Sequence, residues 1–313
     1  MGGGVSITVL AGGVGAAKLL TGLVRLLDQR DLTIIVNTGD DIELHGLHIS
    51  PDIDIITYTL AGIVDEERGW GLRDDTYRCL EALSRLGCEA WFKLGDGDLA
   101  THIYRTSLLR RGFTLSQATA VIAEALGVEA RILPMSDDRV ETRILTGKGS
   151  LHFQEYLVKR GMRDEVLGVE FTGIEDAKPA PGVLDSIVNA DGIIIPPSNP
   201  IVSVGTILSI RGVKEALRST KAKRVAISPL IAGKAVKGPL GKLLNGLGLK
   251  PSAYTVAEIY RDVIDTFVLD EADIQERESI ERLGLRAVSA NTLMESLEDK
   301  VRLAALALEE AQR

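Results

Sequence analysis

The sequence predicts an α/β protein built around a doubly wound, mostly parallel sheet. Apolar runs of strand length alternate with amphipathic helical stretches along most of the 313 residues, a pattern typical of repeated strand–helix–strand units. Polar clusters directly follow most of the expected strands, and ligands of such sheets bind at the carboxyl ends of the strands. We therefore expect one domain over residues 1–313, with its core in residues 1–136 and 183–313 and a small β-rich insertion at 137–182.

The expected elements follow from the length and period of the apolar runs. Strands are expected at 7–11, 33–37, 90–94, 130–134, 192–196, 224–228 and 266–269. Helices are expected at 16–27, 51–64, 75–86, 99–111, 115–126, 213–219, 239–247 and 293–311. Within the insertion, two β-like runs flank the sequence TGKG at 146–149, which is a hairpin signal.

Composition narrows the possible classes of function. Hydrophobic residues make up 45% of the chain and charged residues 26%, which is ordinary for a globular protein. The net charge of −8 argues against a nucleic-acid partner, because such binding rests on many Lys and Arg contacts to phosphates. No apolar run approaches the roughly 18 residues of a membrane span, and the N-terminus lacks the pattern of a signal peptide. We therefore expect no membrane partner and a cytoplasmic location.

A glycine cluster separates the first expected strand from the first expected helix. Gly12, Gly13 and Gly15 have no side chains, so backbone N–H groups there can approach an anion at the favourable end of the helix dipole. Lys18 lies one turn into the helix and can reach a phosphate oxygen. These features predict phosphate binding. The loop matches neither common phosphate-loop pattern. The alternative interpretation, a tight turn that binds no ligand, therefore stays open.

Carboxylates follow the second expected strand. Asp40 and Asp41, in the sequence VNTGDD, offer hard oxygen ligands of the kind that Mg²⁺ prefers, and the alternative is a simple turn. In the next segment, SPDID, Asp52 is accounted for as a first-turn residue of a helix capped by Ser50. Asp54 is not accounted for in this way, because it stands two residues further on among isoleucines.

Three further segments bring polar side chains to the same edge of the expected sheet. Lys93 stands at the end of an apolar run. Its ammonium group must therefore reach a polar environment, either a functional site or an ion pair. Ser198 and Asn199 follow one expected strand and Ser228 ends another, each beside a proline, so that side-chain donors lie near a helix start. Two lysines in the segment GKAVKGP (233–239) could neutralise a diphosphate at this edge.

Taken in order, these segments closely resemble the 2-phospho-L-lactate transferase family, which acts in the biosynthesis of the deazaflavin coenzyme F-420. The resemblance extends over nearly the whole chain and needs no large insertion. It rests on the segments AGGVGAAKLLTGL, IVNTGDD, ISPDIDIITYTLAG, GWGLRDDTY, KLGDGDLATHIYRT, ILPMSDDRVET, LHFQEYLV, PPSNPIVSVGTIL and ISPLIAGKAVKGP.

The resemblance implies a Rossmann-like core and a Mg²⁺-dependent transfer by a homodimer. The donor would be a guanosine diphosphate ester of 2-phospholactate or phosphoenolpyruvate. The acceptor would be the ribityl hydroxyl of the deazaflavin FO (7,8-didemethyl-8-hydroxy-5-deazariboflavin), with GMP released. Asp54 and Lys93 match the family positions that contact FO, and Asp54 would orient or deprotonate the acceptor hydroxyl. Asp40 or Asp41 would ligate Mg²⁺, with Asp54 as a further candidate. The expected nucleotide and phosphate contacts are Gly12, Gly13, Gly15, Lys18, Ser198, Asn199 and Ser228.

One position departs from the family pattern, and one alternative function remains. Many family members read G-D-R-D where this chain has glycine at Gly97, so a positive charge near the site is missing and the donor assignment is weakened. The alternative is a regulatory protein that binds nucleotide sugars and resembles gluconeogenesis factor, with a similar glycine loop and core. Asp54, Lys93 and the segment HFQEYLV favour the transferase.

Overall fold

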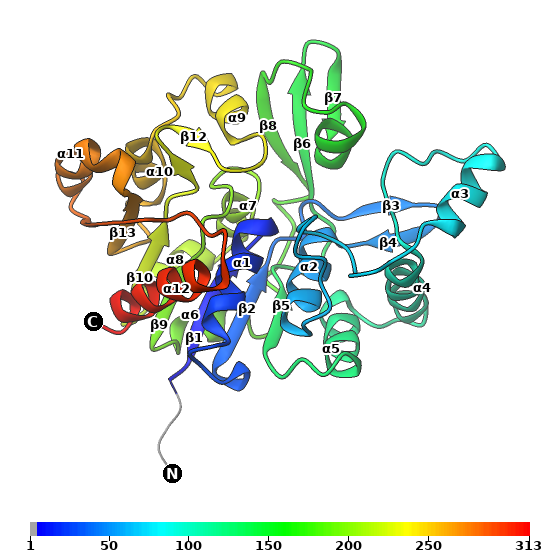
Figure 1. Cartoon of the computed structure of the whole chain (residues 1–313), viewed down its shortest axis with the longest axis horizontal. Coiled ribbons are helices and arrows are strands. Elements are labelled where there is room, and N and C mark those ends of the chain that lie inside the picture. Colours follow the sequence, from blue (N-terminus) through cyan, green and yellow to red (C-terminus); the bar gives the residue numbers. More distant parts are fainter. Residues whose placement is uncertain (1–4) are drawn as a thin grey trace.

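A seven-stranded parallel sheet forms the centre of the computed structural model, which describes residues 5–313 (Figure 1). Residues 1–4, at the start of the predicted domain, lie outside the described residues. In chain order the strands are β1 (Ile7–Ala11), β2 (Leu32–Val36), β5 (Arg131–Pro134), β9 (Gly192–Ile195), β10 (Lys223–Ile227), β13 (Thr266–Asp270) and β14 (Arg286–Ala290). Their spatial order is β14-β13-β10-β9-β1-β2-β5. The predicted doubly wound, Rossmann-like α/β fold is therefore confirmed.

The direction of winding reverses between β1 and β9. From β1 the chain builds outward through β2 to β5, and it then crosses to β9 and builds outward in the other direction. Ile7 of β1 pairs with Leu32 of β2 on one side and with Gly192 of β9 on the other. In sheets of this kind, the carboxyl ends of the strands at the reversal are the usual place for a ligand.

Helices cover both faces of the sheet, because successive strand residues point to opposite sides. In β1, Val9 packs into the core on one face and Leu10 into the core on the other. The first face is covered by α1 (Gly13–Leu23), α2 (Pro51–Leu60), α5 (Leu115–Ala125) and α12 (Leu297–Ala311). The second face is covered by α6 (Val183–Val188), α7 (Val204–Ser209), α8 (Val213–Ser219), α10 (Ala253–Tyr260) and α11 (Arg277–Glu281).

The predicted β-rich insertion forms a small antiparallel sheet. Its strands are β6 (Glu141–Thr146), β7 (Gly149–His152) and β8 (Gly168–Thr172), in the order β7-β6-β8. The π-helical turn Glu155–Lys159 follows β7, and Phe153 and Tyr156 bury their rings in a separate small core with Leu243 of α9 (Leu240–Gly246). Figure 1 shows the insertion as a projection above the carboxyl edge of the central sheet.

A second projection, which we call the arm, was predicted only in part. It contains β3 (Ile42–Leu44), β4 (Leu47–Ile49), α3 (Arg78–Arg85) and α4 (Asp96–Arg110). The predicted strand at 90–94 is wrong, because these residues form no ladder. Leu94 and Phe92 instead pack on the β3–β4 hairpin, so the apolar run covers the arm's own small core.

Other differences concern boundaries and short elements. Helix α1 begins at Gly13, three residues earlier than predicted, so two of the glycines lie in its first turn. The edge strand β14, the hairpin β11 (Leu230–Ile231) with β12 (Lys234–Ala235), and helices α6, α7, α10 and α11 were not predicted. Within residues 5–313, no helix has the length and apolar character needed to cross a membrane.

Candidate active site at the carboxyl edge of the sheet

The loops after β1 and β9 contact each other where the winding reverses. Ser198 Oγ donates to the carbonyl oxygen of Gly12 at 2.8 Å. A Cβ atom at Gly12 would lie 2.6 Å from that of Ser203, and one at Gly15 would overlap the carbonyl oxygen of Pro197. These glycines are therefore required by the close approach of two loops, whatever else binds there.

A carboxylate already occupies one amide of the glycine loop. Asp52, in the first turn of α2, accepts a hydrogen bond from the Gly13 N–H at 2.9 Å and another from Asn37 Nδ2 at 3.0 Å. Burial raises the pKa of Asp52 to about 6 and the Asp41 charge adds to the rise, against the effect of these two hydrogen bonds. Sequence reasoning missed this role, because Ser-Pro-Asp is equally typical of an ordinary helix start.

The acidic loop after β2, residues 37–41, lies beside Asp52. Asn37 Oδ1 accepts from the Gly39 N–H at 2.9 Å and so shapes the loop. Asp40 is buried, and its pKa is raised well above the ordinary value by burial and by the charge of Asp52. Among the described residues, Asp40 Oδ1 and Asp41 Oδ1 are buried and have no hydrogen-bond partner. Two adjacent carboxylates with buried, unpartnered oxygens are suited to a hard divalent cation.

The other groups around Asp41 hold the acidic loop in place. Asp41 Oδ2 accepts from Ser50 Oγ at 2.7 Å and lies 3.0 Å from His48 Nε2. From the insertion, His152 Nε2 lies 3.1 Å from the carbonyl oxygen of Asp41, and its Nδ1 accepts from the Gln154 N–H at 3.1 Å. Burial lowers the pKa of His152, which agrees with a neutral ring that donates from Nε2. The insertion thus helps to position the acidic loop.

Among the described residues, Asp54 forms its hydrogen bonds with α4 and none with the acidic loop. It is two residues after Asp52 on α2, so the two side chains leave the helix in different directions. Both oxygens of Asp54 accept hydrogen bonds from the buried Arg105 guanidinium of α4. His102 lies between Asp54 (Nδ1–Oδ2, 3.6 Å) and Asp98 (Nε2–Oδ1, 3.3 Å). Burial raises the pKa of Asp54, and Arg105 and His102 offset only part of the rise.

The remaining predicted site residues lie in several environments. Lys93 is exposed on the arm. Lys18 is half-buried and donates to the carbonyl oxygen of Met294 at 2.8 Å. Asn199 Oδ1 accepts from the Ile201 and Val202 N–H groups, and the buried Ser228 Oγ donates to the carbonyl oxygen of Leu230. In the structure, Asn199 and Ser228 therefore shape their own loops.

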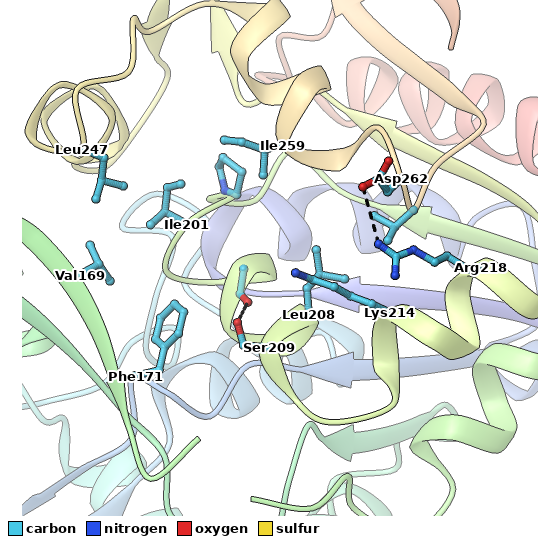
Figure 2. Close-up of a pocket in the computed structure, with 13 residues that line it drawn as sticks. Val169, Phe171, Ile201, Leu208, Ser209, Lys214, Arg218, Leu247, Ile259 and Asp262 are labelled. Atoms are coloured by element: carbon cyan, nitrogen blue, oxygen red, sulfur yellow. Dashed lines mark hydrogen bonds and ion pairs between the residues drawn. The ribbon is translucent and has the colours of Figure 1, made fainter. Parts of the chain in front are cut away.

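A groove lies beside α7 (Figure 2). It has a volume of about 290 Å³ and is lined by Val169 and Phe171 of the insertion, by α7, and by residues of α8 and α10 (Figure 2). Its one lining carboxylate, Asp262, lies 3.6 Å from Arg218, and both are largely exposed. The buried carboxylates Asp40, Asp52, Asp54 and Asp98 lie outside this groove, so it lacks the acidic groups of the candidate site.

The fold and the site together define a doubly wound α/β protein with a carboxylate cluster beside the reversal of its parallel sheet. Residues 7–304 match the protein family described as 2-phospho-L-lactate transferase CofD. The chain belongs to this family, and the resemblance found in the sequence is confirmed.

Individual relatives cover almost the whole chain. It is 43% identical to a 2-phospho-L-lactate transferase of Methanosarcina barkeri over 95% of this chain and 96% of the relative. It is 42% identical to a phosphoenolpyruvate transferase of Streptomyces griseus, over 98% of each. Among solved structures, a UPF0052 family member from Bacillus halodurans superposes with a TM-score of 0.64 at 17% identity, covering 98% of this chain and 99% of the other. That last similarity concerns the fold alone.

Proposed function

We propose that this chain transfers a phospholactyl or phosphoenolpyruvyl group from a guanosine diphosphate ester to the ribityl hydroxyl of FO, releasing GMP, in coenzyme F-420 biosynthesis. Membership of the family makes the chain an enzyme of the transferase class. The structural observation that carries the proposal is the pair of buried, unpartnered carboxylate oxygens of Asp40 and Asp41 beside the glycine loop. In the reaction, the acceptor oxygen bonds to the phosphorus next to the lactyl group. The bond from that phosphorus to the bridging oxygen breaks, GMP leaves with that oxygen, and the hydroxyl proton passes to a base, the role we propose for Asp54.

Asp40 and Asp41 would hold a Mg²⁺ ion. Their unpartnered oxygens are supplied by adjacent residues of one loop, and the negative charge that raises the pKa of Asp40 would be neutralised by a cation. A bound Mg²⁺ would supply positive charge to phosphate oxygens during transfer. Asp52 would position the acidic loop and would not ligate the ion. Its two oxygens accept hydrogen bonds from the Gly13 N–H and from Asn37 Nδ2, and so connect the glycine loop to the acidic loop.

The protein's other task in such a transfer is to align the acceptor hydroxyl with phosphorus. We assign acceptor contacts to Asp54 and Lys93, and nucleotide contacts to the loops after β1, β9 and β10. Arg105 holds Asp54 through one hydrogen bond to each carboxylate oxygen, and each oxygen keeps a second lone pair for the acceptor hydroxyl. The Gly13 N–H is taken by Asp52, which leaves the next amides of α1 for phosphate.

The alternative function, a regulatory protein that binds nucleotide sugars, is compatible with the fold. The two functions differ in measurable ways. We expect the pure protein to release GMP when incubated with FO, Mg²⁺ and a guanosine-activated phospholactate. Absence of GMP release together with tight binding of a uridine diphosphate sugar would overturn the proposed transferase.

The acyl portion of the donor is a separate question. Relatives named for phospholactate and for phosphoenolpyruvate are almost equally identical to this chain. Rates of GMP release from the two donors, compared at equal concentration, would assign the natural one. We also propose that the protein is a homodimer, which a measurement of its mass in solution would test. We propose a cytoplasmic location as well.

The role of Asp54 gives the first mutational prediction. We expect Asp54→Asn to lower turnover at least about 100-fold, in the range of general acid–base effects, with guanosine nucleotide affinity unchanged. Because the change also leaves the Arg105 charge less well balanced, the unfolding free energy must be measured for the same variant. The matched control is Asp98→Asn, in the same buried network on the other side of His102. Near-normal turnover of Asp54→Asn would remove this residue from the mechanism.

A further inference from the structure

Buried polar side chains of α4, in the arm, face buried polar side chains of α2. Asp98, His102 and Arg105 are spaced four and three residues apart, so they share one face of α4. Asp54 and Tyr58 are spaced four residues apart on α2 and contact that face. All five side chains are buried. The arm therefore brings charged and polar groups to Asp54 inside the protein.

These side chains have the spacing of a metal site but not its charge. Asp54, Asp98 and His102 bring ligand atoms to within 4.8 Å of one another. The Arg105 guanidinium lies at the same place, however, with hydrogen bonds to both oxygens of Asp54. A metal ion would be repelled by this permanently charged group. We therefore look for a role in which Arg105 itself takes part.

The guanidinium group of Arg105 is held in one orientation by α2, α4 and β4. Its Nη1 donates to Asp54 Oδ2 at 3.1 Å and its Nη2 donates to Asp54 Oδ1, so the contact is bidentate. Nη1 also lies 3.2 Å from His102 Nδ1 and 3.4 Å from the carbonyl oxygen of His48. Because a guanidinium group can only donate, His102 Nδ1 is the acceptor and the ring carries its proton on Nε2.

The orientation of the guanidinium group determines the orientation of the Asp54 carboxylate. Two parallel hydrogen bonds fix the plane of the carboxylate, and with it the directions of the lone pairs that remain on each oxygen. Alignment of this kind matters for rate, since a displacement of about 1 Å in a reacting group can cost about 100-fold. A lysine in place of Arg105 would keep the charge but could not hold the plane, because an ammonium group acts as a point charge.

We propose that Arg105 is a positioning residue that aligns the Asp54 carboxylate with the acceptor hydroxyl, and that His102 keeps the guanidinium group in the orientation this requires. The inference rests on the proposed function, because it concerns the acceptor side of that transfer. It makes α4, and with it the arm, part of the active site, although the sequence predicted no site residue within α4.

A double-mutant cycle tests whether Arg105 acts through Asp54. We expect Arg105→Lys to lower kcat for GMP release about tenfold or more and to leave the KM for the guanosine donor unchanged. In the Asp54→Asn background the same change should have no further effect on kcat, because the carboxylate that Arg105 aligns is already gone. Arg110→Lys is the matched control, since Arg110 is exposed on the same helix and should keep the kcat of each background.

A second variant keeps the test decisive if Arg105→Lys does not fold, which thermal unfolding would show. His102→Leu removes the acceptor at Nδ1 but retains the Arg105–Asp54 pair, and it should lower kcat in the wild-type background and not in Asp54→Asn. Equal losses of kcat in both backgrounds, or wild-type kcat of the folded variants, would overturn the inference while the transferase stands. Absence of GMP release from the wild type would overturn the proposed function, and this inference with it.

Discussion

Asp40 is a buried carboxyl group beside another one, Asp52, and the consequence can be measured as stability. Its pKa in the folded protein is raised by burial and by Asp52. The ionised form therefore destabilises the fold, an effect that is absent below the unfolded pKa of about 3.9 and grows as the pH rises. We expect Asp40→Asn to raise the free energy of unfolding by about 1 kcal/mol at pH 8 and by nothing measurable at pH 4, in denaturant titrations with EDTA.

Mg²⁺ provides the control for this prediction. A cation that binds only the folded protein raises its stability, so added Mg²⁺ should stabilise the wild type and should stabilise Asp40→Asn less. If Asp40→Asn is less stable than the wild type at pH 8 without Mg²⁺, the electrostatic account of Asp40 is wrong.

Arg105 shows the opposite case, in which a buried charge is well paired. Burial alone would lower the pKa of Arg105, but the charge of Asp54 raises it above the ordinary value. Arg105→Met would leave Asp54 buried without its partner, and we expect a loss of about 3–5 kcal/mol in the free energy of unfolding. Arg110→Met is the control, since Arg110 is an exposed residue of the same helix and should change stability by less than about 1 kcal/mol. Equal effects in denaturant titrations would contradict the prediction.

The sequence pointed to individual residues where their type was unusual for its position. Asp40 and Asp41 were identified because two carboxylates follow a buried strand, and the structure places both there with unpartnered oxygens. Asp52 was missed because its contact with Gly13 joins residues that are 39 positions apart. Nothing in the local sequence distinguishes a carboxylate that caps its own helix from one that accepts a hydrogen bond from the backbone of another helix.

At the level of elements, the start of α1 depends on close packing against the loop after β9. Gly15 has ordinary helical geometry, but a Cβ atom there would overlap the Pro197 carbonyl oxygen. We expect Gly15→Ala to lower the free energy of unfolding by about 1–3 kcal/mol, the usual effect of overpacking, and to weaken GDP binding. Gly241→Ala is the control, because Gly241 is helical in α9 with open space around it and should gain roughly 0.5–1 kcal/mol. A stable Gly15→Ala protein, measured by thermal unfolding, would show that the two loops can separate.

Elements with a clear hydrophobic pattern in the sequence were predicted well. Elements whose secondary structure depends on tertiary packing were not. The strands of the central sheet are apolar on both faces, so β1, β2, β5, β9, β10 and β13 stood out in the sequence. The segment at 90–94 is also mostly apolar, yet it packs on the arm and pairs with no strand. Helix α7, with the sequence VGTILS, contains β-branched residues and glycine, so its helical state depends on packing between the sheet and the insertion.

For the whole molecule, the alternation of strands and helices was enough to predict the architecture, and therefore which loops share one edge. It could not predict how the arm and the insertion meet that edge. Lys159 of the insertion lies 2.7 Å from Glu89 of the arm and 5.6 Å from the centre of the Trp91 ring. His152 supports the acidic loop from the insertion side. Such contacts between projections depend on three-dimensional geometry that no local pattern encodes.

The packing of α1 against the end of the chain has a consequence for protein synthesis. Lys18 of α1 bonds to Met294, 276 residues later, and the backbone of α12 at Lys300 lies against Gly22. A ribosome that adds about 5–20 residues per second needs about 14–55 s to cover that distance. During this time the part of the first helix that packs against α12 has no permanent partner, so this surface must be shielded from aggregation until the last helix emerges.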